Sequence, residues 1–83
     1  MEEKAFFVFH WMKHKDSFDI EVPLEITANE LILALNMGLA LGIDAGDISQ
    51  LYLKATNPIA LLKGNKTLED FGLHNGSEIW FER

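Results

Sequence analysis

The side chains with chemical potential in this chain are three histidines, a few serines and a surplus of carboxylates. His10 and His14 are four residues apart, a spacing at which a helix can present two metal ligands. The surrounding residues predict a strand and the turn after it, so we expect the two rings to diverge and to face solvent. His74 belongs to a separate loop. We therefore predict no metal site and no bound cofactor.

Nucleophilic and acid–base chemistry also lacks a recognisable arrangement. Ser17, Ser49 and Ser77 have no neighbouring base in any recognisable arrangement, whereas an activated serine needs one within hydrogen-bond reach. The glycines fall in separate turns and form no phosphate-binding loop. The adjacent acids Glu69 and Asp70 are better explained by the capping of a helical turn. The chain is predicted not to be an enzyme.

Composition restricts the class of protein further. The 83 residues carry 13 acidic and 7 basic side chains, a net charge of −6, which disfavours binding to nucleic acid. Hydrophobic residues make up 48% of the chain, enough for one small domain over residues 1–83. Cysteine is absent, which excludes disulfides and fits a reducing compartment. The acidic N-terminus is unlike a secretory signal, so a cytoplasmic location is expected.

No segment has the length of a membrane span. The longest apolar stretch, residues 31–41, is interrupted by Asn36, and a span needs roughly 18 apolar residues or more. We therefore predict no insertion into a membrane.

The first half of the chain predicts a hairpin followed by a helix. Residues 5–12 are apolar and rich in aromatic rings, and residues 18–22 alternate strictly between apolar and acidic side chains, so both read as strands. Thr27 and Glu30 have the spacing of a capping box. A helix over residues 28–41 should follow and end at Gly42. Its expected core face contains Leu31, Ala34, Leu35, Gly38, Leu39 and Leu41.

The second half predicts short strands over residues 50–54, 59–62 and 77–82, with one helical turn over residues 67–73 capped by Thr67. The order ββαββ is that of the β-grasp fold, an α+β class in which a mixed sheet packs one helix. We expect the last strand to run parallel to the first. The expected core is Phe18, Ile20, Val22, Leu31, Leu35, Leu39, Leu51, Leu53, Leu62, Leu68, Leu73, Ile79 and Phe81. Strand 1 is apolar on both faces, so either Phe6, Val8 and Met12 or Phe7, Phe9 and Trp11 join this core.

The second half resembles ubiquitin. The run Thr67-Leu68-Glu69-Asp70-Phe71-Gly72-Leu73 is similar to the Thr-Leu-x-Asp-x-x-Ile turn of that family, and a closing strand follows at the same spacing. The segment Asn57-Pro58-Ile59-Ala60-Leu61-Leu62-Lys63-Gly64 and the later Asn75-Gly76 resemble the YukD/EsaB group more closely. This group comprises bacterial ubiquitin-like proteins encoded with type VII secretion systems. The resemblance implies an accessory or regulatory component of such a system.

The C-terminus differs from that of ubiquitin, and this difference bears on whether the chain is conjugated to other proteins or only binds them. Ubiquitin-type modifiers and β-grasp sulfur carriers end in a flexible tail that closes with Gly-Gly, whereas this chain ends with Trp80-Phe81-Glu82-Arg83. We therefore expect a non-enzymatic protein-binding module that is not conjugated to other proteins. The alternative is a ubiquitin-like modifier or sulfur carrier.

Two surfaces are candidates for binding a protein partner, for instance a component of the secretion system. On the sheet, Tyr52 and Trp80 should point away from the helix beside the outward half of strand 1, for which Phe9 and Trp11 are candidates. Alternatively, Lys and Glu stems shield these rings. On the back of the helix, Leu33 and Met37 leave an apolar stripe that a partner, a second copy or the following loop would cover. A homodimer through either surface is one of the alternatives.

Overall fold

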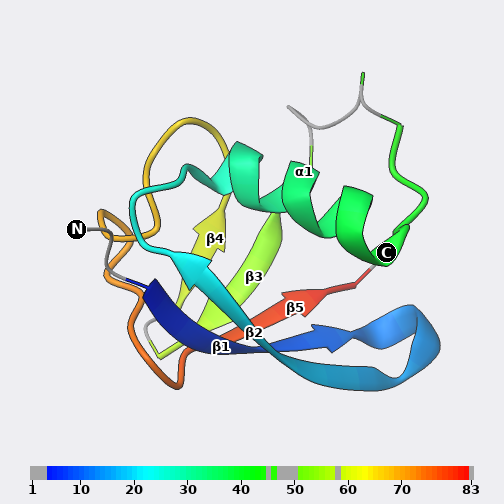
Figure 1. The fold of residues 1–83 in the computed structure, drawn as a ribbon, viewed down its shortest axis with the longest axis horizontal. Helices are drawn as coiled ribbons and strands as arrows, with labels where there is room; N and C mark the ends of the chain where they lie inside the picture. Colours follow the sequence, from blue (N-terminus) through cyan, green and yellow to red (C-terminus); the bar gives the residue numbers. More distant parts are fainter. Residues whose placement is uncertain (1–3, 45, 47–50, 58, 83) are drawn as a thin grey trace.

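The computed structural model describes residues 4–44, 46, 51–57 and 59–82. One helix packs across one face of a five-stranded sheet (Figure 1). In chain order the elements are β1 (Lys4–Trp11), the short 3-10 helix η1 (Met12–His14), β2 (Asp16–Pro23), α1 (Ala28–Leu39), β3 (Leu53–Thr56), β4 (Ala60–Leu62) and β5 (Glu78–Phe81).

The strand order β2-β1-β5-β3-β4 confirms the predicted β-grasp arrangement. The last strand in the chain, β5, lies in the middle of the sheet, parallel to β1 and antiparallel to β3. The β1–β2 and β3–β4 pairs are antiparallel. The parallel β1–β5 pair fits the crossover of α1 between the two halves of the chain.

The first hairpin forms as predicted, with a tighter connection than a plain loop. η1 fills the turn, and Lys15 takes a left-handed conformation at φ 55°, which lets its N–H bond to the Met12 carbonyl at 3.2 Å. Every residue of β1 then pairs with a residue of β2, from Lys4 opposite Pro23 to Trp11 opposite Asp16.

The core lies between α1 and the inner face of the sheet. On β1 this face carries Phe7 and Phe9, which are 1% and 0% exposed, whereas Phe6 is 56% exposed on the other side. The structure thus resolves which half of strand 1 is buried. Nine predicted core residues are buried: Leu31, Leu35, Leu51, Leu53, Leu62, Leu68, Leu73, Ile79 and Phe81. The other four, Phe18, Ile20, Val22 and Leu39, pack against the core while remaining partly exposed.

The capping box at the start of α1 is present in full. The Thr27 hydroxyl accepts the N–H of Glu30 at 3.1 Å, and the Glu30 carboxylate accepts the N–H of Thr27 at 3.0 Å. The helix ends at Leu39, earlier than predicted, because Ala40 turns left-handed at φ 54°. Such a residue interrupts the helical hydrogen bonds.

The buried face of α1 is rotated from the predicted one. Ala28, Leu31, Ile32 and Leu35 are buried, whereas the predicted core residues Ala34 and Gly38 are exposed. Ala34 has a small side chain and Gly38 has none, so burying Ile32 in their place removes more apolar area from water and is favourable.

The remaining elements follow the predicted order with shifted ends. β3 begins at Leu53, and the predicted start at Gln50 lies outside the described residues, as does Pro58 of the next turn. Thr67 caps its turn by accepting the N–H of Asp70 at 3.1 Å, and the N–H of Phe71 bonds to the Thr67 carbonyl at 3.2 Å. Within the described ranges, no helix is long and apolar enough to cross a bilayer.

Replacing Thr27 with alanine tests the capping box. We expect Thr27→Ala to lower the free energy of unfolding by about 1 kcal/mol, because the Glu30 N–H loses its acceptor. Thr27→Ser retains the hydroxyl and should restore most of this loss. Urea denaturation followed by circular dichroism measures both variants. Equal stability of Thr27→Ala and the wild type would contradict this account.

Candidate functional site

The outer face of the sheet, the face turned away from α1, carries the most distinctive side chains of the chain. Strand registers align one residue from each strand in a row across this face. In spatial order the row is Ser17, His10, Trp80, Lys54 and Leu61. Because side chains alternate between the faces of a strand, the buried neighbours of these residues fix their outward direction.

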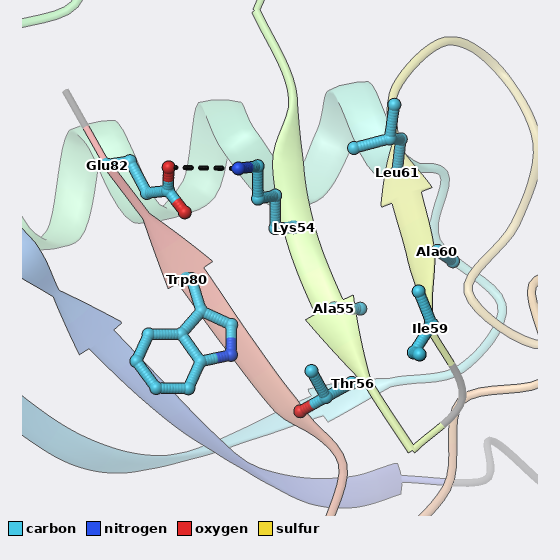
Figure 2. Close-up of a pocket in the computed structure, with 8 residues that line it drawn as sticks. All are labelled: Lys54, Ala55, Thr56, Ile59, Ala60, Leu61, Trp80 and Glu82. Atoms are coloured by element: carbon cyan, nitrogen blue, oxygen red, sulfur yellow. Dashed lines mark ion pairs between the residues drawn. The ribbon is translucent and has the colours of Figure 1, made fainter.

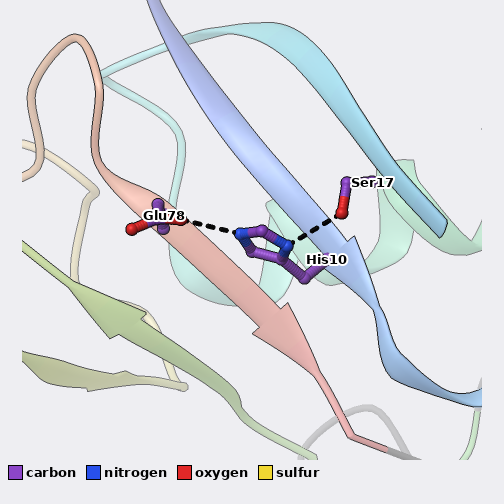
Figure 3. A network of polar contacts seen from close by, with 3 residues as sticks. All are labelled: His10, Ser17 and Glu78. Atoms are coloured by element: carbon purple, nitrogen blue, oxygen red, sulfur yellow. Dashed lines mark hydrogen bonds and ion pairs between the residues drawn. The ribbon is translucent and has the colours of Figure 1, made fainter. Parts of the chain in front are cut away.

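Trp80 occupies the centre of this row and is stacked against His10. The two ring centroids are 3.8 Å apart and the ring planes differ by 16°. Figure 3 shows the imidazole held between β2 and β5: Nδ1 lies 2.9 Å from the Ser17 hydroxyl, and Nε2 lies 2.9 Å from the Glu78 carboxylate. These contacts fix the orientation of the imidazole, and the imidazole in turn covers one side of the indole.

The expectation that His10 faces solvent is therefore wrong, and Ser17 has His10 as a neighbour across the hairpin. Strand pairing places Ser17 and Glu78 on either side of His10, whose side chain is only 17% exposed. In Ser–His–acid hydrolases the serine bonds to Nε2 and the acid orients the ring through Nδ1. Here the two nitrogens are exchanged, with serine at Nδ1 and glutamate at Nε2. This arrangement orients the ring and does not reproduce a hydrolase triad.

An open hollow of about 500 Å³ lies beside Trp80 on the outer face. In Figure 2, Trp80 on β5 borders one side and Leu61 and Ile59 border the other, across β3. The surface of the hollow is largely apolar, and Ile59 and Leu61 are 89% and 51% exposed. Lys54 and Glu82 form an ion pair of 3.1 Å at its margin. An open apolar surface of this kind suits side chains of another protein better than an enclosed small molecule.

Two polar atoms beside the hollow lack hydrogen-bond partners within the described part of the chain. They are the indole Nε1 of Trp80 and the hydroxyl of Thr56, and both are screened from solvent. Figure 2 shows the nitrogen edge of the indole turned toward the side of the hollow on which Thr56 lies. Because unpaired buried polar groups cost free energy, the indole position is maintained by packing and by the stack on His10.

The residues predicted for the sheet surface divide between its two faces. Tyr52, which is 48% exposed, and Trp80 lie on the outer face. Phe9 is 0% exposed in the core, so its assignment to a partner surface is wrong. Trp11 has the same inward direction as Phe9 and packs partly buried against the core, so it does not join the outer face either. Alternation along β1 separates both from Trp80.

The two candidates on the back of α1 are accessible. Leu33 is 41% exposed and Met37 is 77% exposed. The segment after the helix is attached beside them, because the Asn36 side chain donates to the Ile43 carbonyl at 2.9 Å and accepts its N–H at 3.0 Å. This attachment leaves Leu33 and Met37 uncovered. Binding of a partner or a second copy at these residues stays a prediction.

Four outer-face residues were missed as site candidates: Phe6, His10, Ile59 and Leu61. Alternation within residues 59–62 supplies too few positions to choose a face, and β1 is apolar on both faces. The pairing of His10 with Trp80 depends on the β1–β5 register. Among the described residues, no group of three or more His, Cys, Asp or Glu side chains is arranged to hold a metal ion.

The contact between His10 and Trp80 can be tested by substitution. His10→Ala should lower the free energy of unfolding by about 1–2 kcal/mol, because it removes the ring stack and two polar contacts. It should also shift the NMR resonance of the Trp80 indole proton. His74→Ala is the control, because within the described residues its exposed ring makes a single hydrogen bond, to the neighbouring Asn75 carbonyl. Similar effects of the two substitutions would show that His10 does not position Trp80.

Solved structures with a similar fold are ubiquitin-like domains. The C-terminal ubiquitin-like domain of mouse tubulin-specific chaperone e has a TM-score of 0.73 and 13% identity, covering 95% of this chain and 84% of that one. The ubiquitin-like domain of tubulin-binding cofactor B has a TM-score of 0.72 and 16% identity, covering 96% and 89%. At these identities the likeness establishes the fold alone.

A third similar structure comes from a secretion system. It is the ubiquitin-like domain of the Mycobacterium tuberculosis type VII secretion system protein ECCD1, with a TM-score of 0.54, 16% identity and coverage of 94% of this chain and 96% of that one. No curated protein sequence matches the chain significantly. The family model described as the WXG100 protein secretion system (Wss) protein YukD matches residues 9–81. This match confirms the resemblance inferred from the second half of the sequence, and the chain belongs to the YukD family of ubiquitin-like proteins.

Proposed function

We propose that this ubiquitin-like domain is a non-enzymatic docking module of a WXG100-type secretion system, and that it binds a protein component through the outer face of its sheet. The observation that carries the proposal is the open apolar hollow between Trp80 and Leu61. Family membership supplies the secretion setting. The domain acts by reversible contact in the cytoplasm, without conjugation.

The chemistry of the outer face supports docking of a protein. Exposed apolar side chains on monomers mark interaction surfaces when they gather around a buried aromatic anchor. Here Tyr52, Ile59 and Leu61 are exposed on the same face as the half-buried Trp80. The stack on His10 holds the indole in one position, which lowers the entropy lost when a partner packs against it.

Charge around the hollow narrows the class of partner. The outer face carries four acids, Asp19, Glu21, Glu78 and Glu82, and three lysines, Lys4, Lys54 and Lys63. Glu82 is already paired with Lys54. A partner that places an aliphatic or aromatic side chain in the hollow and basic residues around it would complement this surface.

Leu61 gives the sharpest test, because it contributes to the hollow and is half exposed on a short strand at the edge of the sheet. Purified soluble components of the secretion system from the same organism would be measured against the chain by isothermal titration calorimetry. At least one should bind, and Leu61→Asp should weaken that binding by about tenfold or more, a change of about 1.4 kcal/mol.

Leu33→Asp is the matched control for this experiment. It introduces the same charge at a leucine of similar exposure on the back of α1, and should leave the affinity unchanged. If Leu33→Asp weakens binding and Leu61→Asp does not, the docking surface lies on α1 instead of the sheet. Intact-mass analysis after incubation with ATP and cell extract checks the absence of conjugation, because a modifier would appear as a covalent adduct.

A further inference from the structure

Among the described residues, the sheet has one long edge with which no other element pairs. Its order places β2 and β4 at the two edges. β4 has three residues, whereas β2 has eight and is paired with β1 alone. An unpaired edge presents backbone donors and acceptors to another chain. The length of β2 makes it the edge able to bond an added strand.

The backbone groups that are free on β2 can be identified from the bonds of β1. The N–H of Val8 bonds to the Ser77 carbonyl at 3.0 Å, and the Phe6 carbonyl accepts the N–H of Gly76 at 2.9 Å. These residues of β1 therefore direct their backbone groups toward β5, and Phe7, between them, directs its own toward β2. Phe7 is opposite Ile20.

Because backbone groups alternate in direction along a strand, the direction of the other N–H and C=O groups of β2 follows. Ile20 and its alternate neighbours bond to β1, whereas Ser17, Asp19 and Glu21 direct their N–H and C=O groups away from the sheet. Pro23 has the same direction as these three. Its missing N–H therefore costs no bond to β1, as expected for proline on an edge strand.

The side chains of β2 add a distinct pattern to this edge. Its inner side chains Phe18, Ile20 and Val22 are only partly buried, although inner residues of β1 and β5 such as Phe9 and Ile79 are 0% exposed. α1 therefore leaves a strip of apolar side chains along β2 partly exposed. On the outer side, Asp19 and Glu21 are exposed and make no ion pair within the described part of the chain.

From this arrangement we infer that the β2 edge accepts an extended segment of another protein, whose residues alternate between apolar and basic side chains. Backbone bonds would form at Ser17, Asp19 and Glu21. The apolar residues of the added strand would pack against Phe18 and Ile20 and extend the core. Its lysines or arginines would lie opposite Asp19 and Glu21 on the outer side, where opposite charges on paired strands attract.

Charge also argues against a second copy as the occupant. Antiparallel pairing of two β2 strands would bring the acids Asp19 and Glu21 of one copy beside those of the other. Like charges across paired strands are destabilising. The same two carboxylates therefore disfavour self-pairing and favour a basic strand. This inference is independent of docking at the Trp80 hollow, because the two sites involve different strands.

A synthetic ten-residue peptide that alternates valine and lysine tests the inference on the full chain labelled with ¹⁵N. The peptide should slow hydrogen exchange at the Ser17, Asp19 and Glu21 amides. The Phe18 and Ile20 amides are already bonded to β1 and should change little. A peptide of the same composition with its valines and lysines in separate blocks controls for non-specific attraction to the acidic chain.

Two outcomes with the peptides, and one with the chain alone, would overturn the inference. Equal binding of the block peptide would show that alternation has no role. Resonance shifts confined to Trp80 and Leu61 would place the peptide in the hollow, which supports the proposed function and rejects the edge. Protection of the Asp19 and Glu21 amides in the chain alone, with a sedimentation coefficient that rises with concentration, would identify a second copy as the occupant.

Substitutions at Asp19 separate backbone pairing from charge. Asp19→Pro removes an N–H that faces away from β1, so the hairpin should remain folded while affinity for the alternating peptide falls about tenfold or more. Asp19→Ala retains the N–H, and its affinity should fall only about two- to fivefold. A folded Asp19→Pro variant with unchanged affinity would overturn the inference.

Charge reversal decides the question if Asp19→Pro does not fold. The double substitution Asp19→Lys/Glu21→Lys leaves every backbone donor in place. It should bind a peptide that alternates valine and glutamate and lose the valine–lysine peptide, by roughly five- to twentyfold in each direction. Raising the salt concentration should reduce both preferences. The same peptide preference in the wild type and the reversed variant would contradict charge selection at β2.

Discussion

The position of β5 between β1 and β3 is the constraint on which the rest of the structure depends. Ile79 and Phe81 close the core on its inner side, while Trp80 between them faces outward beside His10 and Lys54. A strand of four residues therefore completes the hydrophobic core and supplies the centre of the candidate docking surface. Because side chains alternate along a strand, a shift of one residue would exchange Trp80 with its buried neighbours and would remove both features.

Local signals made much of the fold predictable. The alternating acids after Phe18, the Thr27–Glu30 capping box and the run after Thr67 each identify an element from neighbouring residues alone. The order of these elements was sufficient to predict a β-grasp sheet. Strand 1 was ambiguous because Phe6 and Phe7 are equally apolar. Its inner face was decided by packing against α1, which no pattern within the strand records.

The candidate site was only partly accessible to the same reasoning. Alternation around Trp80 and Tyr52 predicted their outward direction correctly, but Phe9 was placed on the wrong face. The contacts of His10 join residues from the two ends of the chain, so they depend on strand register and have no local signature. The end of α1 was missed for another reason: Gly42 is left-handed as predicted, at φ 79°, but Ala40 already turns left-handed two residues earlier. Neither the left-handed conformation of Ala40 nor the pairing of β1 with β5 has a signal in the neighbouring residues.

The central place of β5 also has a consequence for how the chain reaches its native state. The ribosome synthesises β5 last, yet Phe7 and Phe9 of the first strand cannot be fully covered before it inserts beside them. The inner, apolar face of the β1–β2 hairpin therefore remains partly uncovered until residue 81 has left the exit tunnel. The domain can complete its fold only after β5 has emerged and, because its key pairing joins distant segments, folding is expected to be slower than in a domain with mainly local contacts. During that interval the exposed apolar surface makes the chain prone to aggregation.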